Sequence, residues 1–353
     1  MKLNAFYNKQ TTYLLTKERC LMLLFLVGLM VTPTTFAQNR FSQAAEHLIA
    51  GETMAVVYSG FRKGQHPDRG QGAINPSDDE VLEDLQLLLA HDLSLIRLYD
   101  SGDNSATTLK IIKQHKLPIK VLLGIWLDAE VSNHKNCPWL TEPIPQSQLS
   151  SNMAKNVAEI NRGIKLANIY SNIIVAVNVG NEALVSWNDH MVPVNQVINY
   201  VRQVKQSISQ AVTVADNYEW WISNGNALAK EIDFIGVHTY PAWENKTITQ
   251  ALPYTIQNIT EVHQALPNKP IVVLEAGWAS TSIEFNKQAS EINQKQYFDE
   301  IAQWAKSSNT TFFFFEAFDE PWKGNPNNLK GAEKHWGLFN EDRTPKKVFS
   351  KAE

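Results

Sequence analysis

The fold is decided by residues 173–182, which read Ile-Ile-Val-Ala-Val-Asn-Val-Gly-Asn-Glu and end on a carboxylate. Within them Val175, Val177 and Val179 alternate with small or polar residues, and this period of two predicts a β-strand and not a helix. An α/β barrel carries its chemistry on side chains at the C-terminal ends of its parallel strands. We therefore expect Glu182, the last residue of the run, to act together with a residue that follows another strand.

Strand-like and helix-like segments alternate along the rest of the chain, joined by short loops. We predict strands over 54–58, 94–99, 118–127, 173–182, 211–216, 232–238, 270–275 and 311–316. The helices should cover 78–90, with Ser77 as N-cap, and 106–115, 152–170, 194–210, 224–231, 250–266 and 289–306. Eight strands alternating with helices predict a single α/β domain, a (β/α)8 TIM barrel. A doubly wound sheet is the competing architecture, but the loop from Gly60 to Gly64 lacks its glycine-rich phosphate turn.

The N-terminus has the three-part pattern of a secretory signal. Four basic residues precede an apolar run from Cys20 to Val31, and Thr35-Phe36-Ala37 resembles a small-residue cleavage site. A membrane anchor is the alternative, but the run is short of the ~20 apolar residues that span a bilayer. We expect cleavage after Ala37, which makes residues 1–37 the signal peptide and residues 38–353 the catalytic barrel. The mature protein would be periplasmic or extracellular, with no stable membrane insertion.

Composition narrows the class of partner. Removing residues 1–37 takes four basic and one acidic residue from the 32 and 36 of the chain, which leaves a net charge of −7. An acidic protein is a poor candidate for binding nucleic acid. We expect a monomer.

Ionisable and hydrogen-bonding residues gather where the predicted strands end. Glu275 closes the seventh strand, three strands after Glu182, so the two carboxylates can face each other across the mouth of the barrel. Two carboxylates in unlike environments are what glycoside hydrolysis needs, one protonated to serve as the acid and one ionised. For either glutamate taken alone, the alternative to a catalytic role is a structural salt bridge to Arg97 or to a loop lysine.

The aromatic residues agree with a sugar substrate, because sugar rings can stack on indole. Eight tryptophans lie in or beside the loops after strands; they are Trp126, Trp139, Trp187, Trp220, Trp221, Trp243, Trp278 and Trp322. The alternative is that several of them pack those loops onto the barrel. The chain has no H-E-x-x-H spacing and no G-x-S-x-G elbow, and lone His238 is better explained as a hydrogen-bonding residue than as a metal ligand. We expect neither a metal nor another cofactor.

Three segments resemble glycoside hydrolase family 17, and more narrowly its bacterial β-1,3-glucan-active branch. They are residues 177–183, Val-Asn-Val-Gly-Asn-Glu-Ala, residues 274–280, Leu-Glu-Ala-Gly-Trp-Ala-Ser, and residues 314–323, Phe-Phe-Glu-Ala-Phe-Asp-Glu-Pro-Trp-Lys. The likeness extends from about residue 53 to residue 346. Ala276 and Ala279 depart from the plant members, which carry Ser or Thr and Pro at these places.

The resemblance implies a retaining mechanism with Glu182 as general acid/base and Glu275 as nucleophile. It further implies that Asn181 binds the sugar 2-hydroxyl and that Arg97 and Tyr240 orient the nucleophile. The other expected substrate-binding residues are Tyr58, Tyr99, Trp126, Trp278, Glu316 and Trp322.

Three functions follow from the resemblance. The first is a secreted hydrolase of β-1,3-glucan such as laminarin, with oligo- or polysaccharide substrates. The second is a transglycosylase that uses the same two glutamates to pass glucan to another sugar. The third is a non-catalytic glucan-binding barrel, although a binding module needs no acid/base pair.

Overall fold

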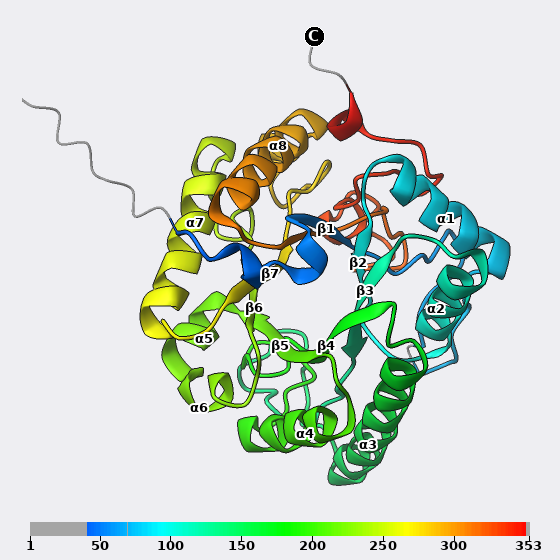
Figure 1. The fold of residues 1–353 in the computed structure, drawn as a ribbon, viewed down its shortest axis with the longest axis vertical. Helices are drawn as coiled ribbons and strands as arrows, with labels where there is room; N and C mark the ends of the chain where they lie inside the picture. Colours follow the sequence, from blue (N-terminus) through cyan, green and yellow to red (C-terminus); the bar gives the residue numbers. More distant parts are fainter. Residues whose placement is uncertain (1–40, 69, 351–353) are drawn as a thin grey trace, which may run out of the picture. The chain divides into compact units, whose positions relative to one another are not determined.

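The structure is a computed structural model that describes residues 41–68 and 70–350. In this part of the chain eight parallel strands form a closed barrel in chain order, because β1 pairs with both β2 and β8. Figure 1 shows the α-helices as a ring outside the strands. The (β/α)8 barrel predicted from the sequence is confirmed. The signal peptide predicted for residues 1–37 lies outside the described residues.

All eight predicted strands are present, most of them shorter than predicted by one to three residues at an end. They are β1 Met54–Val57, β2 Leu95–Arg97, β3 Lys120–Ile125, β4 Ile174–Asn181, β5 Ala211–Asn217, β6 Ile235–His238, β7 Ile271–Ala276 and β8 Phe312–Phe314. Their residues are almost all buried, as expected for parallel strands covered by helices on one face and packed side chains on the other.

The helices follow the prediction with two differences. They are α1 Asp78–Ala90, α2 Asp103–His115, α3 Gln146–Ile169, α4 Val194–Ser207, α5 Tyr218–Asn224, α6 Asn226–Ala229, α7 Ile248–Ala265 and α8 Glu291–Ser308, with 3-10 turns at Ala45–His47, Ile49–Gly51, Asn286–Gln288, Ala332–Lys334 and Lys347–Phe349. Ser77 caps α1 as predicted, in a capping box with Glu80.

The two differences have local causes. α3 begins at Gln146 and not at residue 152. The sequence did not predict the first turn because it is polar and shows no apolar periodicity. The predicted helix 224–231 is present as the shorter α6, but the separate helix α5, which ends just before Gly225, was not predicted. α5 starts at Tyr218, where the Asn217 side chain accepts a hydrogen bond from the backbone N–H of Glu219.

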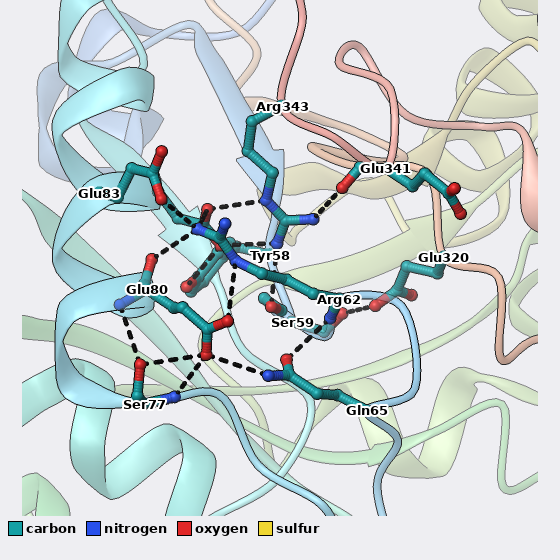
Figure 2. A network of polar contacts seen from close by, with 12 residues as sticks. Tyr58, Ser59, Arg62, Gln65, Ser77, Glu80, Glu83, Glu320, Glu341 and Arg343 are labelled. Atoms are coloured by element: carbon teal, nitrogen blue, oxygen red, sulfur yellow. Dashed lines mark hydrogen bonds and ion pairs between the residues drawn. The ribbon is translucent and has the colours of Figure 1, made fainter.

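A buried ion pair joins the C-terminal segment to the first helix. Arg343 donates to both carboxylate oxygens of Asp84, from Nε and Nη2 at 2.8 Å each, and Asp84 has no exposed surface. Arg62, in the loop after β1, donates to the same carboxylate at 2.8 Å. Figure 2 shows Arg343 and Arg62 converging from these two segments. The network fixes the loop after β1 and the chain after β8 against α1.

Within residues 41–68 and 70–350, no helix is both long enough and apolar enough to cross a membrane.

Candidate active site

Glu182 stands at an irregular end of β4. The pairing of β4 with β5 loses its register between Asn178 and Asn181, and Gly180 has φ +87°. Glu182 itself has φ +48°, in the left-handed region that non-glycine residues rarely adopt. Its backbone N–H still donates to Ala215 O at 2.9 Å, so the strained residue is firmly held. Backbone strain of this kind is typical of functional sites.

Two polar side chains, the buried Asp216 and the partly buried His190, hold the turn that carries Glu182. The Asp216 carboxylate accepts the backbone N–H of Leu184 at 2.9 Å, and the His190 ring contacts Asn181 O at 2.8 Å through Nε2. Burial raises the pKa of Asp216 well above its ordinary value, and the nearby charge of Glu182 raises it further. Side-chain contacts to the backbone of Asn181 and Leu184 therefore fix the turn on both sides of Glu182.

Glu275, in β7, is buried and surrounded by donors. Arg97 Nη1 donates to its Oε1 at 2.7 Å, and the Tyr99 hydroxyl donates to the same oxygen at 2.9 Å. The Tyr240 hydroxyl donates to Oε2 at 2.5 Å. The predicted contacts of Arg97 and Tyr240 with Glu275 are thus present, and Tyr99 joins them.

These contacts keep Glu275 ionised in spite of its burial. Desolvation is the largest influence and would raise the pKa of Glu275, but the charges of His238 and Arg97 and the two tyrosine hydroxyls outweigh it, and the pKa is lowered. In return, burial and the charge of Glu275 raise the pKa values of Tyr99 and Tyr240 well above the ordinary value. The tyrosines therefore stay protonated and donate.

His238, at the end of β6, joins the two glutamates. Its Nδ1 lies 3.0 Å from Glu182 Oε1, while its Nε2 lies 3.3 Å from Arg97 Nη1 and 3.5 Å from Glu275 Oε1. Nδ1 is thus placed to donate to Glu182, while Nε2 lies between Arg97 and Glu275. The sequence identified His238 as a hydrogen-bonding residue but missed this bridge; its position at a strand end was the available signal.

One ligand atom each of Glu182, His238 and Glu275 lies within 4.8 Å of the other two, close enough in principle to share a cation. Arg97 already brings a buried positive charge to within 2.7 Å of Glu275. A metal ion there would be repelled by the guanidinium at short range. The arrangement suits proton transfer between protein and substrate better than metal binding.

Glu316, at the end of β8, is buried beside a cation. Lys323 Nζ lies 2.6 Å from Glu316 Oε2 and also 2.6 Å from Glu320 Oε2. Burial and the charge of Glu320 raise the pKa of Glu316 well above its ordinary value. The charge of Glu316 also contributes, after burial and the charge of Glu275, to the raised pKa of Tyr99.

Two predicted substrate-binding residues point away from the glutamates. The Tyr58 side chain is buried and its hydroxyl donates to Asp84 of α1 at 3.4 Å. The Trp278 side chain is also fully buried, donates to Gln288 O at 2.8 Å and packs against Tyr297 of α8. We expect both to support loops and not to contact substrate.

The other two predicted aromatic residues are half-buried. The Trp126 ring lies 4.5 Å from the ring of His190, which places it beside the turn of Glu182. The Trp322 ring packs edge-on against Phe61 at 5.9 Å, and Lys323 Nζ lies 5.6 Å from it.

Residues 56–337 match the family described as the BtgE/BtgC glycoside hydrolase domain. The chain belongs to this family. It is therefore a glycoside hydrolase, as the resemblance noted in the sequence implied, while the narrower assignments to family 17 and to its bacterial branch stay predictions. A catalytic family leaves no support for the non-catalytic glucan-binding barrel.

Among curated relatives of this glycoside hydrolase is a glucan 1,3-β-glucosidase of Arthroderma benhamiae, 25% identical over 87% of this chain and 96% of the relative. A probable glucan endo-1,3-β-glucosidase, btgC, of Aspergillus fumigatus is 26% identical over 77% of this chain. The match spans only 39% of the length of that second protein.

Solved structures share the barrel. An endo-laminarinase from Formosa aligns with a TM-score of 0.71 and 26% identity, over 85% of this chain and 86% of that one. A β-1,3-glucanosyltransferase from Rhizomucor miehei aligns with a TM-score of 0.64 and 23% identity, over 87% and 98% of the two chains. At that identity the second match shows the fold alone.

Proposed function

We propose that this protein hydrolyses β-1,3-glucan of the laminarin type by a retaining double displacement, with Glu182 as general acid/base and Glu275 as nucleophile. The observation that carries the proposal is that one carboxylate oxygen of Glu182 lies within 4.8 Å of one carboxylate oxygen of Glu275. Retaining glycosidases have carboxyl groups about 5–5.5 Å apart, whereas inverting enzymes need about 6.5–9.5 Å to admit a water molecule. The names of the curated relatives and of the Formosa laminarinase support the substrate.

In the first step Glu182 gives its proton to the glycosidic oxygen while Glu275 attacks the anomeric carbon. The bond from that carbon to the leaving oxygen breaks, and a covalent glycosyl ester forms on Glu275. In the second step Glu182 takes a proton from water, whose oxygen attacks the same carbon and releases Glu275. Two inversions restore the original anomeric configuration.

The surrounding residues fit these roles. Arg97, Tyr99 and Tyr240 keep the nucleophile ionised and fix its direction. The Asn181 amide oxygen accepts from Arg97 Nη2 at 2.5 Å, which leaves its NH2 group as the donor toward a sugar hydroxyl. Of the remaining predicted residues, Glu316, Trp126 and Trp322 stay candidates for neighbouring subsites.

The decisive variant is Glu275→Ala. It should abolish turnover of laminari-oligosaccharides, and added azide or formate should restore activity with a product of inverted anomeric configuration, read by NMR. Glu261→Ala, on the exposed face of α7, is the control and should retain full activity. Near-normal activity of Glu275→Ala would refute the assignment of the nucleophile.

Transglycosylation is the second candidate, since the same two carboxylates serve it when a sugar hydroxyl replaces water. An exposed aromatic surface beside Glu182, described below, favours it. Products longer than the substrate, measured by mass in a time course with one defined laminari-oligosaccharide, would demonstrate transfer.

We also propose that residues 1–37 are removed during export to the periplasm or the medium, leaving the catalytic domain 38–353 as a monomer. N-terminal sequencing of the exported protein should then begin at Gln38. Detection of the intact leader on the exported protein would contradict the proposal.

A further inference from the structure

The loops after β3 and β4, residues 126–145 and 182–193, are bound to each other; we call them the β3/β4 loop pair. The backbone N–H of Glu130 donates to Met191 O at 3.0 Å. Asn133, which is buried, donates from its side chain to Ser186 O at 2.7 Å and also to Asn188 O. Two loops of different strands are thereby fixed as one unit.

This unit presents two tryptophans to solvent. Trp139 is 57% exposed and Trp187 is 39% exposed, and their rings lie 6.5 Å apart at an angle of 62°. His190 and, to a smaller extent, Trp139 lower the pKa of the Asp189 carboxyl. Exposed aromatic surface is unfavourable in water, and paired tryptophans held in a fixed orientation indicate a binding surface.

A continuous chain of contacts leads from this surface to the turn of Glu182. Asp189 Oδ1 lies 3.0 Å from Nδ1 of His190, and Nε2 of the same ring contacts Asn181 O at 2.8 Å. The half-buried ring of Trp126 also lies 4.5 Å from the His190 ring. His190 therefore links the loop pair to the turn that carries Glu182.

We propose that Trp139 and Trp187 bind the sugar units on the leaving-group side of the cleaved bond, which is also the acceptor side in transfer. The inference rests on the proposed roles of Glu182 and Glu275. A nucleophile attacks in line with the leaving group, so the leaving oxygen lies beyond the anomeric carbon as seen from Glu275, beside Glu182. The leaving sugar then continues over the β3/β4 loop pair, where two indole faces can stack on its C–H faces.

The test compares two substrates that share the same donor sugars. An aryl β-laminaribioside has no sugar on the leaving-group side, whereas laminarihexaose supplies several. For the double variant Trp139→Ala/Trp187→Ala, kcat/KM on laminarihexaose should fall about tenfold relative to kcat/KM on the aryl substrate, and the fraction of transfer products should fall with it. Trp139→Phe/Trp187→Phe should recover most of the loss, because phenyl rings still stack.

Ile292→Ala is the matched control, since Ile292 is 65% exposed but lies on α8, outside the β3/β4 loop pair. This substitution should leave kcat/KM unchanged on both substrates. An equal loss of the double alanine variant on both substrates, or no loss on either, would overturn the inference. Failure of the unaltered protein to cleave either substrate would instead refute the proposed function, so the two failures are distinguishable.

Discussion

Removal of one hydroxyl group tests how the protein keeps its nucleophile ionised. In Tyr240→Phe the hydrogen bond of 2.5 Å to Glu275 Oε2 is lost, while the aromatic ring and the contacts of Arg97 and Tyr99 with Oε1 remain. A hydrogen bond to a charged group contributes about 1.5–3 kcal/mol, and about 1.4 kcal/mol corresponds to one pKa unit. The pKa of Glu275 should therefore rise by about 1–2 units.

The sign of the effect on activity follows from the role proposed for Glu275. In that mechanism the carboxylate must be ionised to attack, so activity is lost as pH falls through its pKa, and a raised pKa moves this acid limb toward higher pH. We expect a shift of about 1–2 pH units in the acid limb of kcat/KM and a fall in kcat of about ten- to a hundredfold at the optimum.

The assay is a pH profile on an aryl β-laminaribioside, so that substrate length plays no part. Tyr254→Phe is the control, because that hydroxyl pairs with Tyr218 at 2.8 Å on the outer helix α7. Stability gives a second readout: the lowered pKa of Glu275 stabilises the fold above the unfolded-state pKa, and this is lost on acidification. Acid unfolding of Tyr240→Phe should therefore begin at a higher pH. An unchanged acid limb together with wild-type kcat would refute the reasoning.

Three further substitutions test separate features. Glu182→Gln should slow hydrolysis of substrates with poor leaving groups by about 10²–10⁴-fold, and much less with a dinitrophenyl leaving group that needs no proton. Arg343→Met leaves the buried Asp84 without its bidentate partner and should lower the free energy of unfolding by about 3–5 kcal/mol in a denaturant titration, whereas Arg202→Met, at an exposed ion pair, should leave it nearly unchanged. Ser77→Ala removes the cap of α1 and should cost about 1 kcal/mol in the same titration.

Local patterns were sufficient to predict the architecture. The alternation in residues 173–182 predicted β4, and Ser77 with Glu80 predicted the start of α1, because both signals depend on neighbouring residues only. The start of α3 was missed since its first turn is polar and is held by the fold around it, and the break at Gly225 hid the boundary between α5 and α6.

The sequence predicted which residues lie at the ends of strands. It did not predict the direction in which their side chains point. Glu275 and its contact with Arg97 followed from their places in β7 and β2. Tyr58 and Trp278 also follow strands, but their side chains turn outward to α1 and α8. The His238 bridge was not predictable, because it requires three strands to converge at one height in the barrel.

The positive φ angles at the end of β4 help to explain how one barrel gives the two glutamates different environments. Glu275 lies inside β7 without a positive φ, so it stays among the buried donors of neighbouring strands and is held ionised. Gly180 and Glu182 leave the regular strand with positive φ, which turns Glu182 into a half-buried position next to the β3/β4 loop pair. Among the described residues, the only ion pair recorded for Glu182 is with His238. In the proposed mechanism the acid/base is thus placed where a leaving group, and afterwards water or an acceptor sugar, can reach it, while the nucleophile stays among its buried donors.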